Sequence, residues 1–124
     1  MELTFTGIVE RGMGRAARLG FPTVNITLAD RSLSGIYAAE VRVPGGVLHD
    51  AVAFADPNRK LLEAHLLDFA EDAYGKEVTI TLKKKLRDSR MVADDAELVR
   101  MIAEDVENVK RYFSAARAGA QSGN

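Results

Sequence analysis

The sequence predicts a mainly-β fold, a small antiparallel barrel or sandwich with one C-terminal α-helix packed against it. Two observations indicate this class. Six segments separated by turn residues either alternate apolar and polar residues or are rich in β-forming residues. After them, the apolar period lengthens to three and four residues, which is typical of an amphipathic helix. A chain of 124 residues is long enough for one domain with one core and too short for two.

The first two predicted strands each bury one face. In residues 2–10, the odd positions from Leu3 to Val9 are apolar or glycine, and the residues between them are mostly polar. In residues 23–28, the apolar positions are expected to face the core and are Val24, Ile26 and Leu28. The opposite, solvent-facing side then carries the side-chain oxygens of Thr23, Asn25 and Thr27.

Four further strands are expected at residues 36–43, 47–54, 61–69 and 78–86. A polar connection ending in glycine at residues 29–35 precedes the first of them. Pro44-Gly45-Gly46 predicts a hairpin turn between the first and second, and residues 56–60 predict another turn.

The predicted helix begins near Asp94, where Asp94-Asp95-Ala96-Glu97 forms an Asp-x-x-Glu capping arrangement with acids at the positive end of the dipole. Its apolar stripe consists of Leu98, Met101, Ile102, Val106, Val109 and Phe113. Residues 118–124 have nothing to bury, so we expect a frayed tail there and a single domain at residues 1–117.

Composition excludes several classes of protein. The formal net charge is −1, there is no cysteine, and no stretch approaches the ~18 apolar residues of a membrane span. The start of the chain lacks the regions of a signal peptide, so we expect a cytoplasmic protein. A basic run between Lys83 and Arg90 fits either a solvated strand end or an RNA-binding surface. With only eight aromatic residues and no strand carrying an aromatic pair, base stacking is poorly supported.

A glycine-rich loop at residues 12–20 leads directly into the second strand. Its glycines allow close backbone approach to a ligand, and Arg15 and Arg18 carry donors that suit phosphate. Thr23 and Asn25 follow as two neutral oxygen ligands, a suitable set for the Mg²⁺ of a Mg-nucleotide. The alternative is an ordinary connecting loop followed by solvent-facing polar residues.

Glu63 and His65 lie two residues apart on one face of the predicted strand at residues 61–69. On a mostly apolar face, a carboxylate is suited to accept a proton. The alternative is a glutamate at the rim of the core, with His65 satisfied by a backbone carbonyl.

Two motifs resemble those of the flavokinase (riboflavin kinase) family. Leu19-Gly20-Phe21-Pro22-Thr23-Val24-Asn25, preceded by Gly12-x-Gly14-Arg15, is similar to the motif that ends in Gly-Phe-Pro-Thr-Ala-Asn. Glu63-Ala64-His65-Leu66-Leu67-Asp68-Phe69, followed by Asp72-Ala73-Tyr74-Gly75, is similar to Glu-x-His-Leu-Leu-Asp-Phe…Asp-Leu-Tyr-Gly. The resemblance extends from Gly12 to about Phe113. It implies a six-stranded antiparallel Greek-key β-barrel with the C-terminal helix packed against it.

The resemblance also implies roles for particular residues. Glu63 takes the role of the catalytic base, and Thr23 and Asn25 hold Mg²⁺. The nucleotide is contacted by Gly12, Gly14, Arg15, Arg18, Thr23, Leu66, Asp68 and Tyr74. The flavin is contacted by Arg87, Arg90 and Val92.

The sequence departs from the family pattern on the flavin side. The family's Gly-x-x-Pro-Thr-Phe before the glutamate is replaced by a shorter segment at residues 53–58, and its Pro-Glu-x-x-Phe after Leu-Arg by residues 88–92. Ser89 and Val92 therefore stand in place of the glutamate and phenylalanine. The resemblance implies a monomeric kinase that takes ATP and riboflavin and makes FMN. The alternative is a non-catalytic flavin- or nucleotide-binding module of the same fold.

Overall fold

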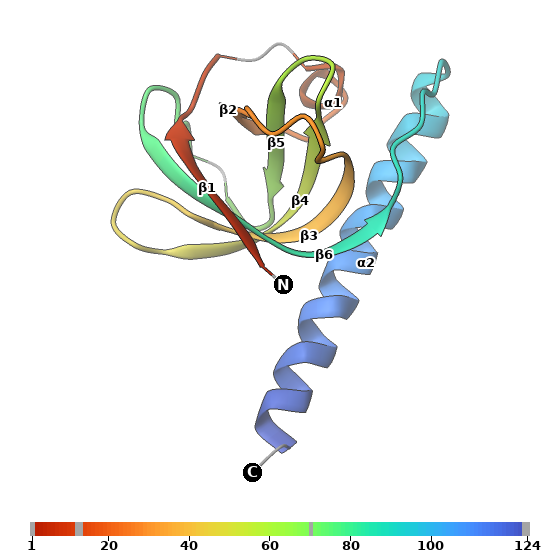
Figure 1. Cartoon of the computed structure of the whole chain (residues 1–124). Coiled ribbons are helices and arrows are strands. Elements are labelled where there is room, and N and C mark those ends of the chain that lie inside the picture. Colours follow the sequence, from red (N-terminus) through yellow and green to blue (C-terminus); the bar gives the residue numbers. More distant parts are fainter. Residues whose placement is uncertain (1, 12–13, 70, 123–124) are drawn as a thin grey trace.

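The computed structural model describes residues 2–11, 14–69 and 71–122. Its six strands are β1 (Leu3–Ile8), β2 (Val24–Thr27), β3 (Gly35–Arg42), β4 (Leu48–Asp56), β5 (Leu61–Leu66) and β6 (Glu77–Arg87). A short helix, α1 (Arg15–Arg18), precedes β2, and the long helix α2 (Asp95–Ser122) follows β6. Figure 1 shows the strands curling into a barrel, with α2 lying along one side. Of the described helices, none is long and apolar enough to cross a membrane.

The strands form one antiparallel sheet in the order β1-β6-β3-β4-β5-β2. The two outer strands approach each other just beyond β1, where the backbone N–H of Glu10 donates to the carbonyl of Asn25 at 2.8 Å. The sheet is therefore a nearly closed barrel, and the expected six-stranded Greek-key architecture is confirmed.

Small side chains fill much of the barrel interior. Five fully buried alanines line it: Ala39, Ala51, Ala53, Ala55 and Ala64. Larger side chains, including Ile26, Leu62 and Ile80, complete the packing. A six-stranded barrel is narrow, so alanine at many inward positions lets the strands close without overpacking. The inward orientation predicted for Val24, Ile26 and Leu28 is confirmed.

A second core lies between the barrel and α2. It consists of Ile36, Ala38, Val52, Val109 and Phe113. Ala38 and Ala39 are both fully buried, because β3 faces the barrel interior on one side and α2 on the other. At the start of α2, the Asp94 carboxylate accepts the backbone N–H of Ala96 at 3.0 Å, as a capping residue does.

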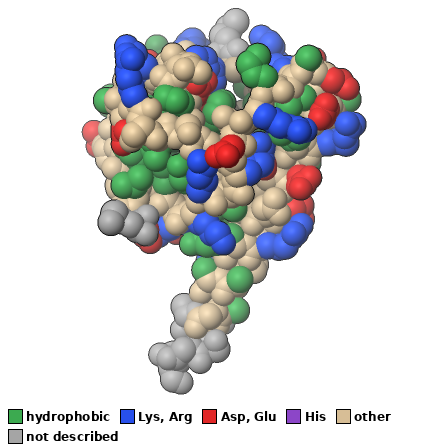
Figure 2. Space-filling view, turned by 45° about the vertical axis from the view of Figure 1, so that its right-hand side comes forward, with side chains coloured by type: hydrophobic (Ala, Val, Ile, Leu, Met, Phe, Trp, Pro, Cys, Tyr) green, Lys and Arg blue, Asp and Glu red, His purple; other side chains and the backbone are tan. Residues whose placement is uncertain are grey.

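The structure differs from the sequence prediction in four places. A single turn of helix, α1, interrupts the glycine-rich loop, because alanines at its centre favour helix. The fifth strand ends at Leu66 rather than Phe69, since Asp68 adopts a positive φ of 57°. Asn25 is buried, with 3% exposure, instead of facing solvent. The helix continues through Ser122, past the predicted tail boundary, and its last turns project beyond the barrel (Figures 1 and 2).

The basic run at the end of β6 is balanced by acids. Lys83 Nζ lies 2.8 Å from Glu2 and 3.1 Å from Glu40, and Lys85 Nζ lies 2.8 Å from Asp88. On the face shown in Figure 2, basic and acidic side chains are intermixed rather than gathered into one basic patch. The geometry matches a solvated strand end better than an RNA-binding surface.

The position of Gly35, at the start of β3, accepts no larger residue without strain. Its φ is 109°, and an added Cβ would lie 2.6 Å from Lys85 Cε and 2.9 Å from the carbonyl oxygen of Arg87. We expect Gly35→Ala to lower the free energy of unfolding by about 1–3 kcal/mol, measured by chemical denaturation. Gly46→Ala is the control, because Gly46 has a φ of 90° with no atom within 4 Å of the added Cβ. Equal losses in the two variants would contradict a role for the close contact with β6.

Candidate active site

Two cavities meet at Thr23. The smaller cavity, about 320 Å³, lies between the β1 end, the start of β2 and the loop that follows β5. The larger cavity, about 440 Å³, lies between the outer faces of β3, β4 and β5, the loop around α1, and the first turns of α2. Thr23 lines both cavities, Glu63 lines the larger one, and the buried Asn25 lines neither.

The position of Thr23 is fixed by the residues around it. The carbonyl of Pro22 lies 2.8 Å from Nδ1 of His65, and the ring of Phe21 packs edge-on against the His65 ring with centroids 5.5 Å apart. His65 is thus satisfied by a backbone carbonyl, the alternative that the sequence left open. These contacts tie the end of the α1 loop to β5.

Antiparallel pairing of β2 with β5 places Asn25 directly opposite Glu63. The Thr23 hydroxyl donates to Oδ1 of Asn25 at 3.3 Å, which holds the two oxygens side by side. Neighbouring oxygen ligands of an octahedral Mg²⁺ at 2.0–2.1 Å lie about 2.9 Å apart, so this pair fits the ion with little adjustment. Among the described residues, no group of three or more His, Cys, Asp or Glu side chains could hold a metal ion.

Glu63 is buried, with 7% exposure, and its carboxylate forms an ion pair with Arg59 at 2.6 Å. Arg59 Nε also donates to Asp56 at 2.6 Å. Burial raises the pKa of the Asp56 carboxyl, but hydrogen bonds from the side chain and backbone of Arg59 outweigh it and hold this pKa below its ordinary value. The hydrogen bond to Asp56 in turn raises the pKa of Arg59. Asp56 lies in the shortened segment and Arg59 in the turn after it, and neither was predicted from the sequence to belong to the site.

The residues predicted to contact a flavin all line the larger cavity: Arg87, Arg90 and Val92. Arg87 is held by a two-pronged ion pair with the buried Asp105 of α2, at 2.9 and 2.7 Å. The hydrogen bond to Asp105 raises the pKa of the Arg87 guanidinium. Arg90 pairs with Glu97 at 2.8 Å. Asp105 was not predicted from the sequence, since only the fold brings it beside Arg87.

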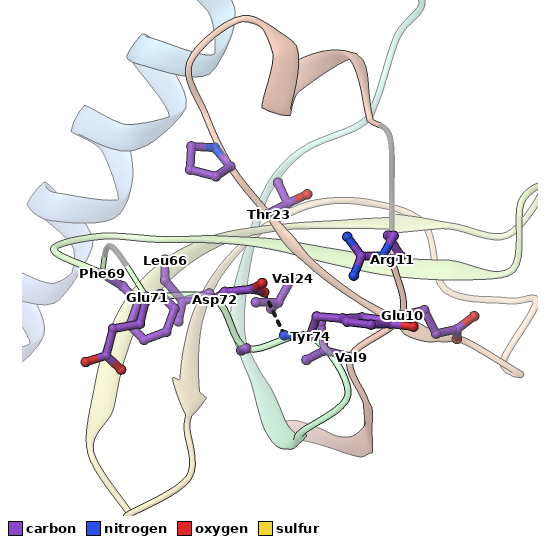
Figure 3. Close-up of a pocket in the computed structure, with 12 residues that line it drawn as sticks. Val9, Glu10, Arg11, Thr23, Val24, Leu66, Phe69, Glu71, Asp72 and Tyr74 are labelled. Atoms are coloured by element: carbon purple, nitrogen blue, oxygen red, sulfur yellow. Dashed lines mark hydrogen bonds between the residues drawn. The ribbon is translucent and has the colours of Figure 1, made fainter.

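The residues predicted to contact a nucleotide are divided between several places. Thr23, Leu66 and Tyr74 line the smaller cavity, whereas the exposed Asp68 and Arg18 line neither cavity. Gly12 lies outside the described residues, and Gly14 lines the larger cavity. The arginine on the wall of the smaller cavity is Arg11, whose guanidinium stacks 4.1 Å from the ring centroid of Tyr74 (Figure 3). Arg11 was not predicted from the sequence, although its position directly before the glycine-rich loop could have marked it as a candidate.

Arg15 points toward α2 instead of the smaller cavity. It donates to the carbonyl of Val92, to the carbonyl of Ala93 at 2.7 Å, and to the carboxylate of Asp95 at 2.7 Å. These contacts join the loop around α1 to the segment that leads into α2. In this conformation Arg15 closes one wall of the larger cavity, and its role at the phosphates stays a prediction.

Comparison with known proteins identifies relatives across most of the chain. A family model described as riboflavin kinase (flavokinase) matches residues 1–113. A bifunctional riboflavin kinase/FMN adenylyltransferase of Escherichia coli is 34% identical over 116 residues, covering 87% of this chain and 37% of the relative. A protein of the same description in Bacillus subtilis is 30% identical over 122 residues, covering 90% of this chain and 39% of the relative. The chain thus spans less than half the length of these curated relatives.

Solved structures share the fold. A macrolide-efflux protein from Streptococcus pneumoniae superposes with a TM-score of 0.74 at 26% identity, covering 87% of this chain and 38% of that one. A riboflavin kinase from Trypanosoma brucei superposes with a TM-score of 0.66 at 24% identity, covering 91% of this chain and 78% of that one. The match of the family model over residues 1–113 shows that the chain belongs to the flavokinase (riboflavin kinase) family.

Proposed function

We propose that this chain is a riboflavin kinase, which transfers the γ-phosphoryl group of ATP to the 5′-hydroxyl of riboflavin and releases FMN and ADP. The observation that carries the proposal is the meeting of the two cavities at Thr23, beside Asn25 and Glu63. Phosphoryl transfer depends mainly on positioning two substrates in line and neutralising charge, and this arrangement brings two ligand spaces to one point.

The smaller cavity suits the nucleotide. The Arg11–Tyr74 stack forms one wall, and the apolar side chains of Leu66 and Val24 form another (Figure 3). Thr23 on its wall and the neighbouring, buried Asn25 would hold Mg²⁺, which would neutralise phosphate charge. Arg15 and Arg18 would contact the phosphates of the nucleotide.

The larger cavity suits the flavin. Apolar side chains from β3, β4 and α2, including Ile36, Val52 and Ile102, offer surface for a planar ring system. Arg87 and Arg90 supply donors on the same wall. With riboflavin seated there, its 5′-hydroxyl would point to Thr23, and Glu63 would accept the hydroxyl proton. We further propose a monomer that acts in the cytoplasm, as the sequence predicts.

The deciding experiment is incubation of the chain with ATP, Mg²⁺ and riboflavin, followed by separation of the flavins. FMN formation is expected. Riboflavin binding without FMN formation would favour the non-catalytic flavin-binding module instead, and absence of both flavin and nucleotide binding would contradict either function.

Asn25→Ala tests the metal site. We expect the Mg²⁺ concentration for half-maximal turnover to rise about tenfold or more, because one of two protein oxygens is lost. Since Asn25 is buried, the variant is also expected to lose about 1–3 kcal/mol of stability, measured separately by thermal denaturation. Thr27→Ala is the control, because Thr27 is exposed on the same strand and its hydroxyl bonds Glu10, whereas Asn25 is buried and bonds Thr23. An unchanged Mg²⁺ dependence in Asn25→Ala would remove Asn25 from the site.

Val92→Phe tests the flavin cavity. Val92 stands where the family pattern has phenylalanine, and it lines the larger cavity. A phenylalanine ring that stacks on the flavin is worth about 0.5–1.5 kcal/mol, so we expect riboflavin to bind about 2- to 12-fold more tightly in a fluorescence titration. Val47→Phe, on the exposed β3–β4 hairpin, is the control and is expected to change nothing. Weaker binding in Val92→Phe would show that this segment does not face the ring.

Glu63→Gln tests the base. Glutamine keeps the size of the side chain and one hydrogen-bonding oxygen but does not accept a proton at neutral pH. We expect kcat to fall about 10²- to 10⁴-fold with riboflavin and Mg-ATP still binding. Glu107→Gln, at an exposed ion pair on α2, is the matched control. Full activity in Glu63→Gln would show that Glu63 is not the base, although the chain would still be a kinase.

A further inference from the structure

The geometry points to Arg59 as a catalytic cation of this chain. During the reaction, the Arg59 guanidinium leaves its ion pair with Glu63 and contacts the transferred phosphoryl group. The inference rests on the proposed kinase function and adds a residue that the family resemblance does not supply. Arg59 directly follows residues 53–58, the segment where the sequence departs from the family's Gly-x-x-Pro-Thr-Phe.

Arg59 is positioned by its neighbours on both sides. Asp56 accepts backbone N–H groups of Asn58 and Arg59 at 3.1 and 3.3 Å, which caps the turn between β4 and β5. The same carboxylate accepts Arg59 Nε at 2.6 Å, and Arg59 Nη2 reaches Glu63 at 2.6 Å. The guanidinium also lies 5.9 Å from the ring centroid of Phe54. One arginine thus spans from a rigid turn to the candidate base.

Among the described residues that line the larger cavity, four are arginines, and their partners differ. Arg15, Arg87 and Arg90 are paired with acids of α2, namely Asp95, Asp105 and Glu97. Arg59 is paired with Glu63, which lies opposite Asn25 in the β2–β5 register. Of these four side chains, Arg59 is therefore the one joined to the point where the two cavities meet.

The ion pair must change for Glu63 to work. In the present structure the Glu63 carboxylate is occupied by Arg59, whereas a general base needs an oxygen directed at the substrate hydroxyl. The Arg59 side chain is 48% exposed, so it can move at small desolvation cost, and Asp56 can keep its hold on Nε while Nη2 leaves Glu63. An incoming phosphoryl group offers the guanidinium a more highly charged partner.

The transfer exchanges one bond at the γ-phosphorus for another. The 5′-oxygen of riboflavin forms a bond to the γ-phosphorus, and the bond from that phosphorus to the β,γ-bridging oxygen breaks, so that ADP leaves. The hydroxyl proton passes to Glu63, released from the ion pair. Arg59 neutralises charge on the equatorial oxygens of the transferred group and afterwards contacts the phosphate of FMN.

The test compares binding of FMN and riboflavin with turnover in Arg59→Gln. We expect kcat to fall about 10- to 100-fold with the KM for riboflavin within about twofold of wild type. Fluorescence titration is expected to show about tenfold weaker binding of FMN and unchanged binding of riboflavin, because FMN carries the phosphate that Arg59 contacts. If Arg59 had only a structural role, Arg59→Gln would weaken the binding of FMN and of riboflavin to the same extent.

Arg59→Lys and Arg117→Gln complete the design. Lysine keeps the charge without the two-pronged reach, so Arg59→Lys is expected to recover part of kcat and part of the preference for FMN. If Arg59→Gln does not fold, the same measurements of kcat and of FMN and riboflavin binding are made on Arg59→Lys. Arg117, which pairs with Asp50 and stacks on Phe113 away from both cavities, is the matched control and is expected to behave as wild type.

Equal loss of FMN and riboflavin affinity in Arg59→Gln, or kcat at or above the wild-type value, would overturn the role of Arg59. Either result still requires a wild-type protein that makes FMN. A wild-type chain that makes no FMN contradicts the proposed kinase function instead, so the two failures are distinguishable.

Discussion

The pairing of β2 with β5 is the constraint on which the candidate site depends. It places Asn25 opposite Glu63 on the outer face of these strands, while the alternate residues Val24, Ile26 and Leu62 fill the barrel interior. A slip of one residue would exchange the two faces and bury the polar pair in the apolar core. The hydrophobic pattern that closes the barrel therefore also fixes the register of the site.

That register carries an electrostatic requirement. Asn25 and Glu63 are almost fully buried, and a buried polar group without a partner costs about 1–3 kcal/mol. The Thr23 hydroxyl satisfies Asn25 and the Arg59 guanidinium satisfies Glu63, and among the described residues no buried side-chain nitrogen or oxygen lacks a partner. Substrates and Mg²⁺ would replace these partners rather than enter an unsatisfied site.

Much of the fold follows from local pattern. Alternation in β2 and the three- and four-residue period in α2 predict both elements, and the inward faces of β2 are as expected. The site is less accessible from sequence, because its contacts join distant segments. Arg15 reaches Asp95, and Arg87 reaches Asp105, through tertiary packing that no spacing reveals. Asn25 is buried although alternation assigns its strand face to solvent, and the pattern of β2 alone does not reveal this.

The five ion pairs made by arginines of the larger cavity divide into two kinds. Three join Arg15 of the α1 loop, Arg87 of β6 and Arg90 of the connection before α2 to acids of α2, and they hold together the wall against which the proposed flavin ring would pack. A neutral ring needs no net charge, and paired arginines give it donors without attracting free anions. The two pairs of Arg59, with Asp56 and Glu63, lie within the β4–β5 turn and its flanking strands, and neither involves a residue of α2. The rearrangement proposed for Arg59 is thus separated from the ion pairs that join the barrel to the helix.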